Sequence, residues 1–390
     1  MTSFLARVYV FKFFDAFIVI FPLYAVMFVD AGLTPVEIAV ALTTWSAVAF
    51  VVEVPAGVIA DRFPRKWVLA LAQFARAAGF VVWWIYPHFW GFLIGLMLWG
   101  VKSGFTSGTF EALLYDELKA QDRAGDYPRI IGRARAAQSI AVLLASLGAA
   151  ATTHYGYGLA LALSLASITV AIIAAAALPP VPKASDVEDR SYLTHLRDGL
   201  SEGIRHPAIL GIVAFSALVL ALGQALGEFW PVFGAKAGLG RPAIALFVAA
   251  QSALEVVANT QAHRVFGFAR RWFYIALIGA GLVLAAAAAV FSPWSMILLV
   301  LYSGAMKVVD TVFEGRLQQA IGSANRATVG SLKGFAAQIG VSSLYLTFGP
   351  LAQATSYRVA FMACGAATLT VGAAYLAWGR ATPPVSGERA

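Results

Sequence analysis

Residues 57–66 read Gly-Val-Ile-Ala-Asp-Arg-Phe-Pro-Arg-Lys and form a short charged segment between two long apolar runs, at 36–60 and 66–87. A bilayer-spanning helix needs about 20 apolar residues, so each run is long enough to cross a membrane. Further runs of this kind lie on both sides, separated by short polar clusters. The sequence therefore predicts twelve membrane-spanning helices, at 8–29, 36–60, 66–87, 90–115, 134–153, 157–179, 207–233, 242–262, 271–291, 294–317, 328–350 and 356–378.

The composition agrees with a membrane protein. Of the 390 residues, 60% are hydrophobic and only 12% are charged, whereas an ordinary soluble domain contains about 25% charged residues. A dozen spans use about 240 residues, which leaves no room for a sizeable aqueous domain. The single cysteine, Cys364, excludes an internal disulfide framework. A soluble globular protein is thereby excluded.

The net charge of +8 is better explained by membrane topology than by a nucleic-acid partner. If the N-terminus is cytoplasmic, 20 of the 28 Lys and Arg fall in cytoplasmic segments and five lie within the spans. Only Lys236, Arg241 and Arg358 fall in segments on the outer side of the membrane. An excess of Lys and Arg is typical of cytoplasmic loops. We therefore expect a multi-pass protein of the cell (inner) membrane, with both termini in the cytoplasm and no nucleic-acid partner.

One long polar stretch, from Pro179 to His206, divides the apolar runs into two sets of six. It opens with a proline cluster and continues with the pattern of a short amphipathic surface helix. The sequence thus predicts an N-terminal six-helix half at 1–180, a cytoplasmic linker with an amphipathic helix at 181–206, a C-terminal six-helix half at 207–380 and a cytoplasmic tail at 381–390.

Short motifs recur between the two sets at spacings of 202, 203 and 200 residues. The matched groups are Glu53, Val54, Ala56, Ala60 and Arg62 with Glu255, Val256, Ala258, Ala262 and Arg264; Phe110, Glu111 and Leu114 with Phe313, Glu314 and Leu317; and Ala136, Ala137 and Gln138 with Ala336, Ala337 and Gln338. Three matches in order at nearly one spacing indicate duplicated halves. Transporters with parallel repeats of this kind have their substrate site between the repeats, near the membrane midplane.

The segment 57–66 resembles the loop motif Gly-x-x-x-Asp-Arg-x-Gly-Arg-Lys of the major facilitator superfamily. The matching positions are Gly57, Asp61, Arg62, Arg65 and Lys66, and a proline stands where the family has its second glycine. The resemblance implies an all-α integral membrane fold of 12 helices in two pseudo-symmetric halves, and secondary transport by alternating access. The segments 53–57 and 107–116 are similar to a bacterial branch described as efflux permeases.

The resemblance also implies a conformational latch, with the residues Gly57, Asp61, Arg62, Arg65 and Asp116. In such a latch Asp61 accepts hydrogen bonds at the N-terminus of the eleventh span, and Arg62 or Arg65 pairs with Asp116 or Glu117. The alternative is that the basic residues only anchor the chain to the cytoplasmic leaflet.

In this family the first, fourth, seventh and tenth spans line the central cavity. Lys102 and Lys307 stand near the midpoints of the fourth and tenth spans, where two ammonium groups suit an anionic group on a substrate. Alternatively, Lys102 pairs with Asp15 or Glu255, and Lys307 pairs with Asp310, as contacts between helices. The predicted substrate-binding residues are Lys102, Lys307, Asp310, Trp99, Phe17 and Gln224.

Glu53 and Glu255 occupy matching positions in the second and eighth spans. A carboxylate partly removed from water can take up and release a proton as the halves alternate. Structural hydrogen bonding between the halves is an equal alternative. The predicted proton-coupling residues are Asp15, Glu53, Glu255, Glu228, Glu111 and Glu314.

The sequence does not indicate an enzyme, and it predicts neither a cofactor nor a metal. It has no Gly-x-x-x-x-Gly-Lys loop for a nucleotide and no Cys or His cluster at metal-ligand spacing. We expect a monomer, in contact with membrane lipid, that exports a small amphipathic or anionic organic molecule in exchange for protons. Residues 141–151 lack the Gly-x-x-x-Gly-Pro pattern common in antiporters of the family. Proton-coupled import of an organic anion, or a lipid flippase on the same fold, is therefore the alternative.

Overall fold

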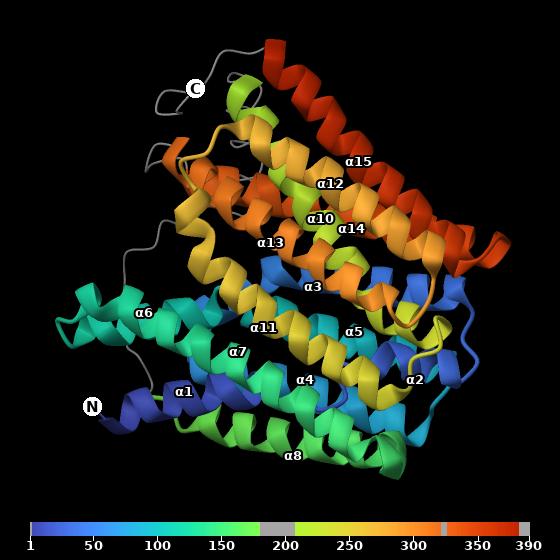
Figure 1. Ribbon diagram of the computed structural model, residues 1–390. Coiled ribbons are helices and arrows are strands. Elements are labelled where there is room, and N and C mark those ends of the chain that lie inside the picture. Colours follow the sequence, from blue (N-terminus) through green and yellow to red (C-terminus); the bar gives the residue numbers. More distant parts are fainter. Residues whose placement is uncertain (1, 180–206, 321–325, 382–390) are drawn as a thin grey trace. The chain divides into compact units, whose positions relative to one another are not determined.

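The computed structural model describes residues 2–179, 207–320 and 326–381, and this part of the chain contains helices and turns but no strand. Ten of its helical ranges are long and apolar enough to span a membrane. The helices, labelled in Figure 1, are α1 (Thr2–Ala16), α2 (Tyr24–Asp30), α3 (Pro35–Arg62), α4 (Arg65–Ile85), α5 (Phe89–Thr106), α6 (Thr109–Ala120), α7 (Tyr127–Thr152), α8 (Gly156–Ala176), α10 (Pro207–Lys236), α11 (Arg241–Val265), α12 (Arg270–Val290), α13 (Ser295–Ala320), α14 (Arg326–Ala354) and α15 (Tyr357–Ala381). The predicted all-α membrane fold is confirmed.

Every predicted span coincides with one of these helices or with two in succession. The agreement follows from the long uninterrupted apolar runs, which in a membrane can satisfy their backbone hydrogen bonds only as helices. The predicted linker with its amphipathic helix at 181–206 lies outside the described residues, as does the tail beyond residue 381.

The prediction of one continuous first span at 8–29 is wrong. α1 ends at Ala16, α2 begins at Tyr24, and residues 17–23 form no helix. Pro22 has no N–H to donate, and its ring disfavours a helical conformation in the residue before it. The first helix ends six residues before the proline, and the second begins two residues after it.

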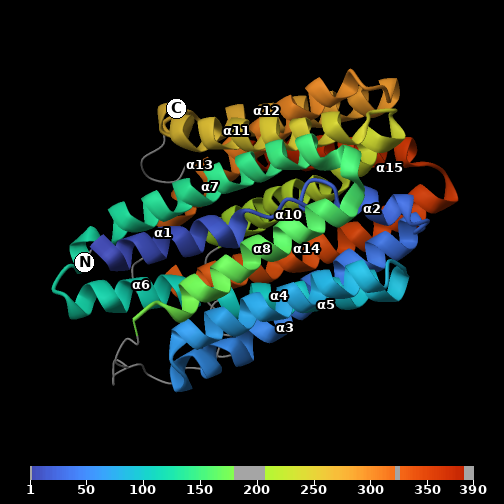
Figure 2. The same ribbon diagram turned by 90° about the horizontal axis from the view of Figure 1, so that it is seen from below.

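Two serines of α8 bind backbone groups at this interruption. The N–H of Ile20 donates to Oγ of Ser164 at 3.0 Å, and Oγ of Ser167 donates to the carbonyl of Phe14 at 2.9 Å. Figure 2 shows α1 lying beside α8, against which it packs. Since no water is available inside a membrane, these hydroxyls replace the bonds that a continuous helix would have made.

The fourth predicted span, 90–115, is also divided. α5 ends at Thr106 and α6 begins at Thr109. Between them Gly108 has a φ of +71°, a left-handed conformation that glycine adopts without the steric cost of a side chain. The glycine thus ends one helix and redirects the next.

The described chain groups into two compact units. The first contains the residues up to Pro179 together with Arg241–Ser252, and the second contains Pro207–Gly240 and the residues from Ala253 onward. The predicted boundaries of the two halves stay a prediction, since this grouping assigns the beginning of α11 to the first unit.

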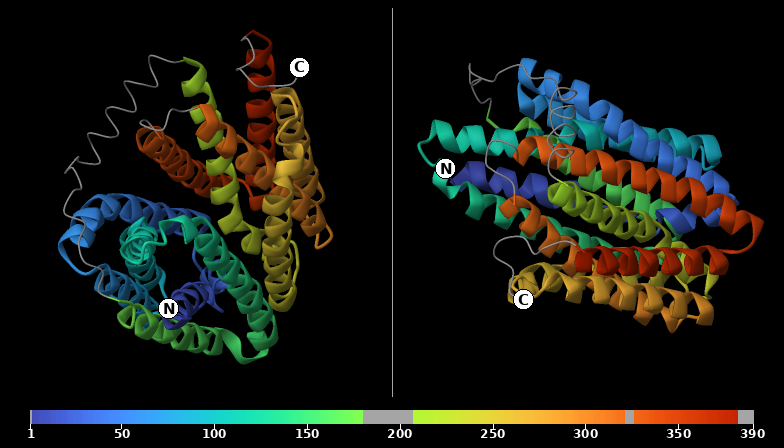
Figure 3. Two further views of the ribbon diagram at one scale, coloured as in Figure 1. Left: turned by 90° about the vertical axis from the view of Figure 1, so that its left-hand side faces the viewer. Right: turned by 90° about the horizontal axis from the view of Figure 1, so that it is seen from above.

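Part of the helix packing recurs between the two units, whereas the extensive contact of α3 with α5 has no counterpart of similar extent between α11 and α13. In the first unit α1 packs against α7 and α8, and α4 packs against α5 and α8. In the second unit α10 packs against α14 and α15, and α12 packs against α13 and α15; the pair α12 and α15 is gold and red in Figure 3. Matched residues are also buried alike: Phe110 and Phe313 are each 1% exposed. This repetition is what duplication of a six-helix half produces.

The substitution Ser164→Ala should destabilise the first unit. It leaves the buried N–H of Ile20 without its acceptor, and an unsatisfied buried donor costs about 1–3 kcal/mol. Thermal unfolding of the purified protein in detergent measures the effect. Thr169→Ala is the control, because the Thr169 hydroxyl is exposed and bonds only to its own helix. Equal unfolding temperatures for the two variants would show that the serine does not support the interruption.

Candidate functional site

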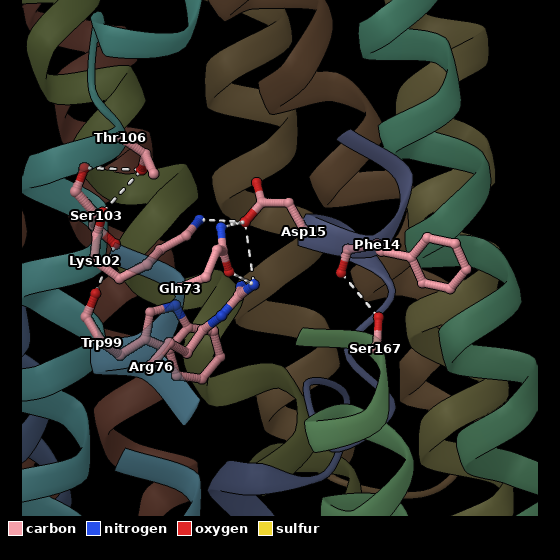
Figure 4. A network of polar contacts seen from close by, with 9 residues as sticks. All are labelled: Phe14, Asp15, Gln73, Arg76, Trp99, Lys102, Ser103, Thr106 and Ser167. Carbon is pink, nitrogen blue, oxygen red and sulfur yellow. Dashed lines mark hydrogen bonds and ion pairs between the residues drawn. The ribbon is translucent and has the colours of Figure 1, made fainter. Parts of the chain in front are cut away.

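The last turn of α1 places Asp15 against two other helices of the first unit. Nζ of Lys102 on α5 lies 2.8 Å from Oδ1 of Asp15, and Nη2 of Arg76 on α4 lies 3.1 Å from the same oxygen. Gln73, one turn before Arg76, donates from Nε2 to this oxygen at 2.6 Å, and its Oε1 accepts a hydrogen bond from Arg76. Figure 4 shows the side chains of Lys102, Arg76 and Gln73 converging on the carboxylate of Asp15, and together the four residues form a cluster. We call them the Asp15 cluster.

The Asp15 cluster is withdrawn from solvent. The exposed fractions of the side chains are 3% for Arg76, 10% for Asp15 and 12% for Lys102. Charges inside a membrane protein are costly unless they are paired, and this cluster pairs one carboxylate with two cations. It therefore keeps one formal positive charge.

A pocket of about 520 Å³ adjoins the cluster. Four helices of the first unit and the turn between α5 and α6 supply its walls. The lining residues are Phe11, Lys12 and Asp15 of α1; Lys102, Ser103, Thr106, Ser107 and Gly108 of α5 and the turn; Phe110 and Glu111 of α6; and Arg135 and Gln138 of α7. A small organic molecule fits a space of this size.

The pocket wall contains more cationic than anionic side chains. Lys12, Lys102 and Arg135 are cationic, whereas Asp15 and Glu111 are anionic. Within the described part of the chain, no ion pair joins Lys12, Arg135 or Glu111 to another residue, and Nζ of Lys12 instead lies 4.3 Å from the centroid of a phenylalanine ring of α6. The wall therefore presents an excess of positive charge that is available to a ligand.

The turn between α5 and α6 adds polar groups to this wall. Ser103, Thr106 and Ser107 line the pocket, and the N-terminus of α6 follows directly after them. The hydroxyls of Ser103 and Thr106 bond to carbonyls of their own helix, as Figure 4 shows. The positive end of the α6 dipole thus supplements the cationic side chains.

Three further predicted residues of the first unit lie around this site. Glu53 on α3 accepts a hydrogen bond from Oγ of Ser107 at 2.7 Å. Trp99 belongs to an aromatic cluster, with its ring centroid 5.3 Å from that of Phe80. Phe17 stacks on the ring of Phe13 at 5.7 Å. Of the three side chains, only that of Glu53 has a hydrogen bond to a residue that lines the pocket; Trp99 accepts one from Ser103 through its backbone carbonyl.

The predicted residues of the second unit form a separate group. Nζ of Lys307 lies 3.6 Å from Oδ2 of Asp310, and both residues belong to α13. Glu314, one turn further on, pairs with Lys333 of α14. Lys333 also lies 3.8 Å from Oδ1 of Asp310. We call these four residues the Asp310 cluster.

The remaining predicted residues of the second unit are more dispersed. Glu255 on α11 is half-buried and interacts electrostatically with Lys307. Glu228 on α10 is half-buried and interacts electrostatically with Tyr345 of α14. The side chain of Gln224 is exposed.

At the predicted latch, Arg65 at the start of α4 forms an ion pair with Asp116 of α6. Arg62 is exposed. A Cβ added to Gly57 would meet nothing within 4 Å, so packing in this structure does not require glycine there. The side chain of Asp61 lies outside the described residues. The latch function of these residues stays a prediction.

Sequence reasoning did not select Arg135, Gln138 or Lys333 as site residues. The sequence pattern predicts that the fifth span begins at residue 134, whereas α7 begins at Tyr127, so Arg135 is well inside a helix. The recurring Ala-Ala-Gln motif was the available signal, because its glutamine, Gln138, lines the pocket. Among the described residues, no three His, Cys, Asp or Glu side chains are grouped as metal ligands.

The substitution Asp15→Asn should strongly destabilise the protein. It leaves Lys102 and Arg76 as buried cations without a counter-charge, and breaking a buried pair in this way costs about 3–5 kcal/mol. The double variant Asp15→Asn with Lys102→Met should recover part of the loss, because it removes one of the two cations. Asp116→Asn breaks a more exposed pair and should cost about 1 kcal/mol or less. Thermal unfolding compares the three, and wild-type stability of Asp15→Asn would contradict this interpretation.

Comparisons with known proteins were made for the whole chain. Residues 5–341 match the family model of the Major Facilitator Superfamily. No curated protein matches the sequence. Among solved structures, the nucleoside transporter NupG has a TM-score of 0.80 at 15% identity, covering 97% of this chain and 99% of its own. The D-xylose-proton symporter has a TM-score of 0.66 at 13% identity, covering 94% of this chain and 95% of its own.

A bacterial homologue of the human lysosomal transporter Spinster, solved in an inward-facing, unoccupied conformation, has a TM-score of 0.74 at 15% identity, with 96% of each chain covered. At such identities the likeness of these structures concerns the fold alone. The family model, however, spans most of the sequence. The chain therefore belongs to the Major Facilitator Superfamily and is a multi-pass membrane protein with the fold of that family.

Proposed function

We propose that the protein is a secondary transporter that works by alternating access and carries a small organic anion. The observation that supports this most directly is the charge of the pocket in the first unit. Its wall contains three cationic side chains and two carboxylates, and Arg76 adds a further cation directly behind Asp15. A carboxylate or similar group on the substrate would balance this excess.

The two kinds of cation in the pocket have different tasks in this proposal. Lys102 is held by Asp15 at 2.8 Å and supplies a fixed positive background. Lys12 and Arg135 form no ion pair among the described residues, and they approach the pocket from α1 and α7. An anion placed between them pairs with both, and guanidinium groups bind carboxylates with two parallel hydrogen bonds.

The two phenylalanines of the pocket wall offer a substrate little apolar surface. The rings of Phe11 and Phe110 stack with centroids 5.7 Å apart, and each residue is only 1% exposed. In this proposal the charged and hydroxyl groups of the wall therefore recognise the anionic end of the substrate.

Proton-coupled export is the form of transport that we propose. The resemblance of segments 53–57 and 107–116 to efflux permeases favours export, and the half-buried Glu111 places a carboxylate beside the substrate site. The D-xylose neighbour is named a proton symporter, which keeps import by symport as the second candidate. We place the protein in the cell membrane with both termini cytoplasmic, as the distribution of Lys and Arg favours.

Binding of simple anions to the purified protein tests the proposal. The probes are benzoate, succinate and lactate, with tetraphenylphosphonium, D-xylose and adenosine as cationic and neutral comparisons. Binding to the folded state raises its stability by about 2.7 kcal/mol at a hundredfold excess over Kd. We expect the thermal unfolding temperature to rise with one or more of the anions and with none of the other probes.

The variants Lys12→Met and Arg135→Gln should each weaken this stabilisation by about tenfold in apparent Kd, the effect of losing about 1.4 kcal/mol of interaction. Lys119→Gln is the matched control, because Lys119 is an exposed cation of α6 that does not line the pocket. Stabilisation by the cation or the neutral solutes, unchanged in both pocket variants, would refute an anion site.

The direction of transport requires proteoliposomes loaded with a probe that binds. An outward-directed flux driven by an opposing proton gradient supports export, and accumulation driven by a parallel gradient supports symport. Redistribution of labelled phospholipid between the leaflets, without flux of any soluble probe, would replace both by the lipid flippase.

A further inference from the structure

The Asp310 cluster of the second unit leaves one carboxylate oxygen without a hydrogen bond. Oδ1 of Asp310 is buried and accepts no hydrogen bond from any described residue. Its nearest cation, Nζ of Lys333, is 3.8 Å away, and Nζ of Lys307 is 3.6 Å from the other oxygen. Both separations exceed the usual length of an N–H···O bond, which is about 2.7–3.2 Å.

The Asp15 cluster of the first unit has the opposite geometry. Oδ1 of Asp15 lies within 3.1 Å of Arg76 and 2.8 Å of Lys102, and it accepts a hydrogen bond from Gln73 at 2.6 Å. All three of these donors contact Oδ1, so a proton on the other carboxylate oxygen would leave the contacts in place but would remove the negative charge that compensates Arg76 and Lys102. A proton on Oδ1 of Asp310 displaces no hydrogen bond.

The two carboxylates also differ in whether their partner cations keep another negative charge nearby when the carboxylate is neutralised. If Asp15 is neutralised, Arg76 and Lys102 have no other carboxylate in electrostatic range among the described residues. If Asp310 is neutralised, Lys333 keeps its pair with Glu314, and Lys307 keeps its interaction with Glu255. Protonation of Asp310 therefore leaves no buried cation uncompensated, which is the costly condition.

Other charged groups around Asp310 come from every element packed near α13. On α13 itself these are Lys307, Glu314 and Arg316, the last bonded to the carbonyls of Phe266 and Phe268. The helices α10, α11 and α14 contribute Glu228, Glu255 and Lys333. In α12 and α15 the charged residues whose side chains are described are Arg270 and Arg271 in the first turn of α12 and Arg358 in the first turn of α15. Lys307 and Lys333 are thus the cations that face Asp310.

We propose that Asp310, rather than Asp15, is the carboxylate that binds the transported proton. A hydronium ion from the water on one side of the membrane gives its proton to Oδ1, an O–H bond forms, and the carboxylate loses its charge. Lys307 is then released from Asp310. When the proton leaves to water on the other side, the ion pairs with Lys307 and Lys333 form again. This assignment rests on the proposal that transport is coupled to protons. The sequence leaves two tasks open for Asp310, substrate binding and proton exchange, and the assignment selects the second, in place of Asp15, which the sequence favours for the proton.

Infrared difference spectroscopy of the purified protein tests this proposal without a substrate. Spectra at mildly acidic and mildly alkaline pH are subtracted, and the carbonyl stretch of a protonated carboxylic acid is followed through the titration. In wild-type protein grown with ¹³C-labelled aspartate, we expect a band that titrates and shifts on labelling. A titrating band that does not shift belongs to a glutamate and overturns the assignment.

Variants identify which aspartate gives the band. Asp310→Asn should abolish it, whereas Asp116→Asn, which removes a half-buried carboxylate of the first unit, should keep it. In Asp310→Glu the band should persist but no longer shift when aspartate is labelled, and this variant serves if the asparagine variant does not fold. A labelled band that persists in both position-310 variants would overturn the proposal.

This result is independent of anion binding. If the anions of the previous subsection fail to bind while the Asp310 band titrates, the proposed substrate class is wrong and the proton site stands. If the anions bind and no aspartate band titrates, the pocket assignment stands and the proton site is wrong.

Discussion

A carboxylate inside a membrane protein has to be neutralised, and in the first unit Lys102 and Arg76 neutralise Asp15 from two different helices. This requirement brings α1, α4 and α5 together at one point. It also gives the adjoining pocket an excess of positive charge, because one carboxylate compensates only one of the two cations. The substrate class that we propose follows from that imbalance.

The two units share part of their helix packing but differ in how their charges are arranged. In the first unit three donors, two of them cations, contact the same carboxylate oxygen, Oδ1 of Asp15. The second unit spreads two acids and two lysines along α13 and α14, and it leaves Oδ1 of Asp310 without a donor. We propose that one scaffold was duplicated, and that divergence of a few side chains gave one unit a fixed charge and the other a carboxylate that can change its charge.

The sequence was sufficient for the helices because a long apolar run in a membrane has no alternative to a helix. It did not reveal the interruption at residues 17–23, since the hydroxyls that make the interruption possible, Ser164 and Ser167, come from α8. The pairing of Lys102 with Asp15 was one of two interpretations of the sequence, and only three-dimensional contacts decide between them. Arg135 was missed for a related reason, because its position in the pocket wall depends on how α7 packs against α1.

The most direct measurement compares two probes that differ only in charge. Isothermal titration calorimetry with benzoate and with benzamide, on the purified wild-type protein, keeps the aromatic body constant and changes the anionic end to a neutral one. The account predicts that benzoate binds at least about tenfold more tightly, a difference of about 1.4 kcal/mol. Equal affinities, or tighter binding of benzamide, would contradict the claim that the positive charge of the first-unit pocket selects the substrate.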